Sequence, residues 1–229
     1  MITIRNAHER GRASFGWLNS RHTFSFGHYY DPAHMGFSRL RVINDDSVAP
    51  GAGFETHGHR DMEIISYVLE GSIAHRDSSG NEKVLTTGEF QLMSAGRGIL
   101  HSEFNPSTTQ PLKFLQIWIE PEVSGGEPGY QQKDFGNEPG LTLVVSPDGA
   151  EGSLVIKQDA RLYQLWLEQG QESSLALTSG RRAWVQLVEG ELSVNGERLA
   201  PGDGAAISNE SRLDFTALRP VRALIFELP

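Results

Sequence analysis

The chain has 229 residues, a formal net charge of −9 and no cysteine. This length allows one large domain or two small ones, and the lack of cysteine rules out disulfides and thiolate chemistry. The negative charge argues against a nucleic-acid surface or a basic membrane patch, because phosphate contacts require clustered lysine and arginine. Without a signal-peptide segment or an apolar run of membrane-spanning length, the expected location is cytoplasmic.

The first half of the chain is predicted to consist almost entirely of strands. Its segments are short, rich in β-branched and aromatic residues, and separated by Gly, Pro, Asn and Asp. The run 44–46 is expected to end one of them, and 112–120 is expected to be central because it is long and apolar. Strands are predicted at 2–4, 23–26, 40–43, 64–69, 88–93 and 112–120, with a hairpin within 72–84.

The second half shows the same punctuation after a change in composition. Gly and Pro pairs with few aliphatic residues fill the region near 126–139, which we take as a linker between domains at 1–125 and 140–229. Short, evenly spaced strands indicate a β-sandwich or barrel, and no long amphipathic helix is apparent. The later strands are predicted at 141–145, 153–157, 161–167, 174–177, 183–188, 191–194 and 222–228.

The two halves repeat each other around a Gly-bounded hairpin. The run that ends at Gly71 matches the run that ends at Gly190, and a Gly-acid turn follows in both. All eight histidines lie between His8 and His101, so the second half contains none. A histidine metal site in the first half therefore cannot be repeated in the second.

Two histidine-bearing segments are the strongest chemical signal. His57 and His59 are two residues apart, so in a strand they lie on one face, about 6.6 Å apart at ~3.3 Å per residue. His101 and Glu103 repeat this spacing on what is expected to be a neighbouring strand. Three imidazoles and one carboxylate suit Fe(II), Mn(II), Co(II), Ni(II), Cu(II) or Zn(II). The sequence predicts one divalent metal ion at these four residues.

Other side chains have competing interpretations. Phe54 and Phe104 are candidates for an aromatic substrate pocket, but ordinary core packing explains each of them equally well. Arg60 is either an orienting hydrogen-bond partner of the site or a surface ion pair. His75, next to a predicted turn, is expected to be solvated. His22, His28 and His34 are interpreted as local hydrogen-bonding or pocket-rim groups rather than further ligands.

The histidine segments resemble the two motifs of the cupin superfamily, and the repeated halves resemble a bicupin, which has two jelly-roll β-sandwich or barrel domains in one chain. The motif residues are Gly51-x5-His57-x-His59-x3-Glu63 and Gly98-x2-His101-x3-Asn105. Further segments are similar to the pirin signature and to the bacterial pirin-like quercetin 2,3-dioxygenases: His22-Thr-Phe-Ser-Phe26, Tyr30-Asp-Pro32, Gly36-Phe37, Met93-Ser-Ala-Gly96 and His101-Ser-Glu103.

The resemblance implies a function and roles for the site. Pirins hold one non-haem metal, usually iron, through the equivalents of the four predicted ligands. Glu63, four residues after His59, is expected to support the site from outside the ligand set. A flavonol such as quercetin would bind with O2, Glu103 would accept the 3-hydroxyl proton as general base, and the heterocycle would open with release of carbon monoxide.

The resemblance also implies a rival function. Some pirins act without catalysis, as metal-binding regulators of transcription or of a metabolic enzyme through protein–protein contact. A different cupin reaction on another small molecule is the second alternative. In all of these interpretations the chain is expected to be a monomer with no nucleic-acid or membrane partner.

Overall fold

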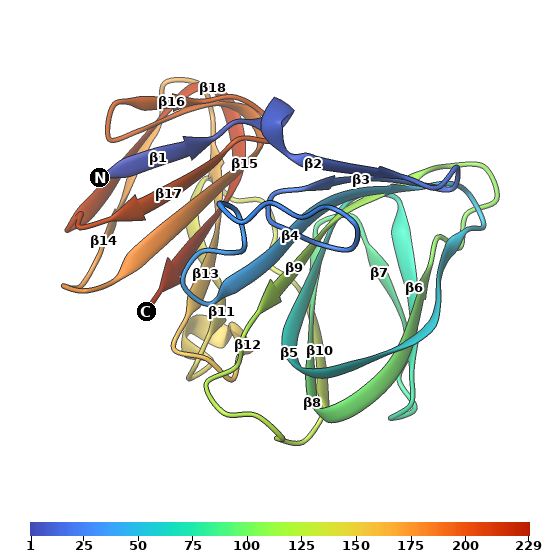
Figure 1. Cartoon of the computed structure of the whole chain (residues 1–229). Helices are drawn as coiled ribbons and strands as arrows, with labels where there is room; N and C mark the ends of the chain where they lie inside the picture. The colour runs from blue at the N-terminus through green and yellow to red at the C-terminus, as the bar shows by residue number, and fades with distance from the viewer. The chain divides into compact units, whose positions relative to one another are not determined.

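The computed structural model describes residues 1–229 and divides into two compact units. The N-terminal unit comprises Gly11–Gly136 and Ile156–Gln158, and the C-terminal unit comprises Met1–Arg10, Asn137–Val155 and Asp159–Pro229. Each unit holds one nine-stranded sheet (Figure 1). No helix of the chain is both long enough and apolar enough to cross a membrane.

These units divide the chain at different places from the predicted boundaries. The first strand, β1 (Ile2–Arg5), pairs with β17 (Gly204–Ser208), which assigns the N-terminus to the C-terminal unit. The region predicted as a linker contains β10 (Gly129–Asp134), which pairs with β8 (Glu89–Phe104) of the N-terminal unit. Both differences arise because a strand pairs with a partner distant in sequence, which local composition does not reveal.

The N-terminal unit closes its sheet around an apolar cluster. The cluster joins Leu18 with Leu85, which come from strands near opposite ends of the order β2-β3-β4-β9-β5-β8-β6-β7. Since their side chains pack together, the sheet must curl round on itself. The predicted hairpin is present as β6 and β7. The remaining strands of this unit are β2 (Gly11–Ser14), β3 (Leu18–His22), β4 (Leu40–Val48), β5 (Gly53–Glu70), β6 (Ser72–Asp77), β7 (Glu82–Thr86) and β9 (Leu112–Ile119).

The C-terminal unit has a larger apolar core. Ile4 of β1 and Leu141 of β11 pack against the same cluster although their strands lie near opposite ends of the order β1-β17-β15-β18-β13-β11-β12. This sheet therefore also encloses its core. The elements not yet named are the 3₁₀ helices η1 (Ala7–Glu9) and η2 (Ala150–Gly152), and the strands β11 (Gly140–Ser146), β12 (Leu154–Val155), β13 (Arg161–Leu167), β14 (Glu172–Ala176), β15 (Arg182–Val194), β16 (Glu197–Leu199) and β18 (Arg212–Leu228).

Two predicted strands of this unit, 183–188 and 191–194, form the single strand β15. Gly190 lies within it with a φ of 88°, and a Cβ there would lie 1.8 Å from the Pro220 carbonyl oxygen. Only glycine allows β15 and β18 to approach so closely at this bulge. The break predicted between 188 and 191 is therefore an irregularity within one paired strand.

We expect Phe215→Ala to destabilise the C-terminal unit by about 3–5 kcal/mol, because it leaves a cavity in the enclosed core. Phe215 is 1% exposed within the cluster, whereas Phe15 is 56% exposed and serves as the matched control. Urea unfolding followed by tryptophan fluorescence measures both variants. Equal unfolding midpoints for Phe215→Ala and Phe15→Ala would contradict the assignment of Phe215 to the core.

Candidate metal centre

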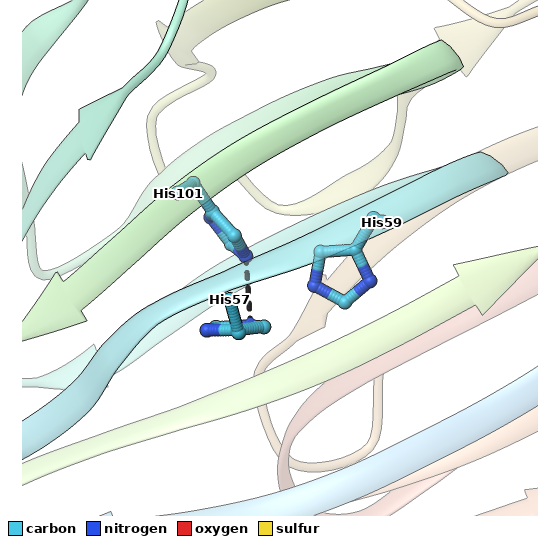
Figure 2. Close-up of side chains that lie close together, drawn as sticks. All are labelled: His57, His59 and His101. Carbon is cyan, nitrogen blue, oxygen red and sulfur yellow. Dashed lines mark hydrogen bonds between the residues drawn. The ribbon is translucent and has the colours of Figure 1, made fainter.

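Three of the four predicted ligands converge in the N-terminal unit. β5 and β8 pair antiparallel with His57 opposite His101 and His59 opposite Ile99, so the three imidazoles lie on one face. The ring centroids of His57 and His101 are 4.5 Å apart, and those of His59 and His101 are 4.9 Å apart. Figure 2 shows the three rings pointing toward one another from two adjacent strands. We call these three residues the histidine trio.

The spacing of the trio fits a single metal ion. The Nε2 atoms of His57 and His101 are 3.1 Å apart, and one ring nitrogen from each of the three residues lies within 4.8 Å of the others. Metal–nitrogen bonds of about 2.0–2.1 Å place two nitrogens bound at right angles about 3 Å apart. The 3.1 Å separation of His57 and His101 is the one that a single divalent ion requires, and a ring nitrogen of His59 lies close by.

Two members of the trio, His59 and His101, are also in the chemical state that metal binding requires. Burial, together with the neighbouring imidazoles, lowers the pKa of His101 to about 3 and that of His59 to about 4. Nδ1–H of His57 donates to the Glu55 carbonyl oxygen at 2.7 Å, which leaves Nε2 with its lone pair. At neutral pH His59 and His101 are uncharged, which is the form that binds metals.

Glu103 lies beside His101 but not in the same group as His57 and His59. It is 3% exposed, and its carboxylate accepts hydrogen bonds from Ser66 Oγ at 3.1 Å and Gln116 Nε2 at 2.9 Å. One of its oxygens lies within 4.8 Å of ring nitrogens of His101 and His75. The structure thus places an oriented carboxylate next to the trio, and its role as a ligand stays a prediction.

His75 was predicted to be solvated, and this prediction was wrong. Its side chain is fully buried on β6, and Nε2 lies 3.0 Å from Oδ2 of the equally buried Asp77. The register of β6 with β8 sets His75 opposite Glu103 and Asp77 opposite His101. The sequence did carry a signal, since His75-x-Asp77 has the same two-residue spacing as the predicted ligand pairs.

The aromatic candidates separate onto two faces. Phe54 lies near the trio, 6.4 Å from the His57 ring, and Trp118 meets the His59 ring edge-on at 5.0 Å. Phe104 follows Glu103 directly in β8, so it projects from the opposite face. There it lines a hollow of about 500 Å³ together with Arg76 and Val84. Phe104 is therefore not part of a pocket around the trio, whereas Phe54 stays a candidate.

Neither Arg60 nor Glu63 is placed to bind a metal ion together with the trio. Arg60 is exposed and follows His59 directly, so it points away from the trio. Glu63 is fully buried and accepts hydrogen bonds from Ser94 Oγ at 2.9 Å and from the backbone N–H of Lys157 at 3.2 Å. Burial raises the pKa of Glu63. Its contacts attach the segment Ile156–Gln158 to β5, which is a structural role.

The three other candidate histidines differ in their surroundings. His22 is 4% exposed, lies 5.4 Å from the Phe26 ring, and has a pKa lowered by burial. His34 is partly exposed, with Nε2 3.9 Å from Asp31, and His28 is exposed. None of the three belongs to a group of side chains close enough to share a metal ion. His22 instead begins a row of polar side chains across the sheet.

This polar row was not anticipated from the sequence. Strand register places five polar side chains side by side across β3, β4, β9, β5 and β8, on the face that carries Glu103. Two of them hold the Glu103 carboxylate. The row contains His22, Asn44, Gln116, Ser66 and Gln91. The run 44–46, predicted to end a strand, continues β4, and its alternate residues Asn44 and Asp46 face the interior.

Asp46, two residues from the row on β4, gives a pH-dependent prediction for the metal-free protein. Burial, together with the nearby carboxylates of Asp45 and Glu103, raises its pKa to about 7. Between pH 4 and 7 the unfolded chain ionises Asp46 while the folded chain keeps the proton, so the free energy of unfolding falls as pH rises. Between pH 5 and pH 8 we expect this loss in the free energy of unfolding to be on the order of 3 kcal/mol, and we expect it to be absent in Asp46→Asn.

Urea unfolding of both metal-free proteins at pH 5 and pH 8 measures this effect. Asp46→Asn should gain stability relative to the unsubstituted protein on going to pH 8. A stability difference that is the same at both pH values would show that Asp46 does not carry a raised pKa.

Two family models together match most of the chain. Residues 3–119 match the model described as Pirin, and residues 143–228 match the Quercetinase C-terminal cupin domain. These matches and the nearly all-β structure confirm the predicted bicupin fold class, with two cupin domains in one chain.

Several similar proteins match this chain over its full length. Quercetin 2,3-dioxygenase of Escherichia coli strain K12 is 50% identical over 229 residues, covering 100% of this chain and 99% of that protein. Pirin-like protein YhaK of the same strain is 38% identical over 100% of both. The crystal structure of bacterial pirin YhhW in complex with nickel(II) from Escherichia coli is similar, with a TM-score of 0.98, 50% identity, and coverage of 100% of this chain and 99% of that chain. The chain therefore belongs to the pirin family of cupin proteins.

Proposed function

We propose that this chain is a metal-dependent quercetin 2,3-dioxygenase. The observation that carries the proposal is the histidine trio beside the buried Glu103 carboxylate. A protein named quercetin 2,3-dioxygenase that is 50% identical over the whole chain supports the choice of substrate and reaction. The substrates would be a flavonol and O2.

The donor set of the trio and Glu103 fits one divalent metal ion, and a 50% identical pirin was crystallised with nickel(II). We infer Fe(II) as the native ion, with Mn, Co, Ni, Cu and Zn as competitors for the same donors. When bound, the ion supplies a Lewis acid and an electron donor to the flavonol and O2. His57, His59, His101 and Glu103 would hold it.

Glu103 would take the proton of the flavonol 3-hydroxyl at a carboxylate oxygen. Ser66 and Gln116 donate to this carboxylate and hold it in one orientation beside His101. A base fixed in this way needs no rearrangement to receive a proton. Phe54 and Trp118 offer apolar ring surfaces next to the trio for a flat aromatic substrate.

The reaction is balanced without a further reagent. Two carbon–carbon bonds of the heterocycle break, both oxygen atoms of O2 enter the product, and the ring opens to a depside. The carbon that carried the 3-hydroxyl leaves as carbon monoxide. O2 is the oxidant, and the flavonol is the only compound oxidised.

The proposal is tested by loading metal-free protein with each candidate ion and following the loss of quercetin absorbance in air. We expect turnover with Fe(II) or another divalent ion, and none with metal-free protein. Equal rates with and without metal would overturn the proposal. If no metal form turns over, the non-enzymatic regulator becomes the better interpretation.

A further inference from the structure

His75 and Asp77 form a buried dyad that the reaction above does not use. Asp77 accepts hydrogen bonds from the backbone N–H groups of Ser79 and Asn81 and from the Asn81 side chain. Burial alone would raise the pKa of Asp77, but these hydrogen bonds and the one from His75 lower it. Asp77 therefore stays an acceptor, and His75 must present Nε2–H to it. In the tautomer that donates only Nε2–H, the lone pair of the ring is on Nδ1.

Nδ1 of His75 has no hydrogen-bond partner although it is buried, and the same holds for Nδ1 of His101. The two rings have centroids 5.4 Å apart, and one nitrogen of each lies within 4.8 Å of the other. His57 is the contrasting case, since the Glu55 carbonyl already fixes its ring. His101 therefore lacks the outer partner that a ligating histidine ordinarily has.

The proton on His101 explains why such a partner is needed. In the structure Nε2 of His101 lies 3.1 Å from Nε2 of His57, whose proton is on Nδ1, so His101 is the donor. A metal ion that takes the Nε2 lone pair forces the proton of His101 onto Nδ1. A buried Nδ1–H requires an acceptor, because an unpaired donor costs about 1–3 kcal/mol.

We propose that His75, held by Asp77, is the positioning residue that accepts a hydrogen bond from Nδ1–H of His101, directly or through one water molecule, and so holds His101 in its metal-binding tautomer. The inference rests on the metal site proposed above. Asp77, His75 and His101 would form a relay that ends at the metal. Its expected contribution is the 10- to 100-fold in metal affinity that outer partners of ligating histidines typically supply.

The alternative is that His75, His101 and Glu103 bind a second ion of their own. This arrangement is disfavoured because His101 and Glu103 are already ligands of the proposed centre, and a second ion would force both to serve two metals at once. The two arrangements differ in stoichiometry, with one bound ion per chain in our proposal and two in the alternative.

Matched variants separate the hydrogen bond from packing. His75→Asn keeps an acceptor at the δ position, whereas His75→Leu has the same branching and no acceptor. We expect Ni(II) titration calorimetry to give one ion per chain, a Kd about 10- to 100-fold weaker for His75→Leu, and recovery of most of the affinity in His75→Asn. Equal Kd values for the two variants, or two ions per unsubstituted chain, would overturn the inference.

Nitrogen-15 NMR of the unsubstituted protein loaded with Zn(II) provides a second test, which does not depend on whether a variant folds. The expected spectrum has His101 protonated at Nδ1 and His75 protonated at Nε2. A His75 protonated at Nδ1 would overturn the inference while leaving the metal site intact. Failure of the unsubstituted protein to bind any ion would instead refute the proposed metal centre, and this inference with it.

Discussion

His101→Ala is expected to weaken Ni(II) binding by more than about 100-fold and to abolish turnover. This loss exceeds the roughly 10- to 100-fold that is typical when only a hydrogen-bond partner of a ligand is removed. His101 is the buried member of the trio, 1% exposed, and its ring lies within 4.9 Å of both other rings. Its removal leaves two partly exposed imidazoles on one strand. Titration calorimetry measures the affinity.

His28→Ala is the matched control for this substitution, because His28 is exposed and belongs to no metal-binding group. It should leave the Ni(II) affinity unchanged, which excludes a general effect of losing one histidine. Unchanged affinity in His101→Ala would mean that the ion binds elsewhere, and the trio would then lose its assignment.

Glu103→Gln is expected to lower the turnover of quercetin by at least about 100-fold, the lower end of the contribution of a general base. The fold should survive, because the new side-chain oxygen at position 103 still accepts a hydrogen bond from Ser66. The Gln116 side-chain amide can rotate by 180° so that its oxygen accepts from the new NH2 group. Steady-state kinetics of the metal-loaded variant, with its unfolding midpoint, separates lost chemistry from lost structure.

Glu63→Gln is the matched control for the base. Glu63 is also a buried carboxylate on β5, but it contacts Ser94 and the Lys157 backbone and not the trio. It should retain turnover. If Glu103→Gln turns over at the unsubstituted rate, Glu103 is not the base, and a different group must receive the proton.

The geometry of the trio follows from simple strand rules. Alternation places His57 and His59 on one face, and pairing of β5 with β8 brings His101 opposite His57. The same alternation turns Arg60 and Phe104 away from the trio, although both were predicted as candidates for its surroundings. His75 has the same spacing from Asp77 but was predicted to be solvated, because a polar turn follows it in the sequence.

Long-range pairing explains the differences that sequence could not reveal. β1 joins β17, and β10 joins β8, across more than 30 residues in each case, so neither partner is visible in local composition. The polar run at 44–46 resembles a turn, yet Asn44 and Asp46 are each 3% exposed inside the N-terminal unit. Burial of polar side chains at a functional site is where hydrophobic patterning fails.

Oxygen uptake combined with carbon monoxide detection, using quercetin, Fe(II)-loaded protein and His101→Ala in parallel, is the most direct test of the proposed dioxygenase activity. We expect one carbon monoxide released for each O2 consumed by the unsubstituted protein, and neither process in the variant. Oxygen uptake without carbon monoxide, or equal release from His101→Ala, would contradict the proposed activity.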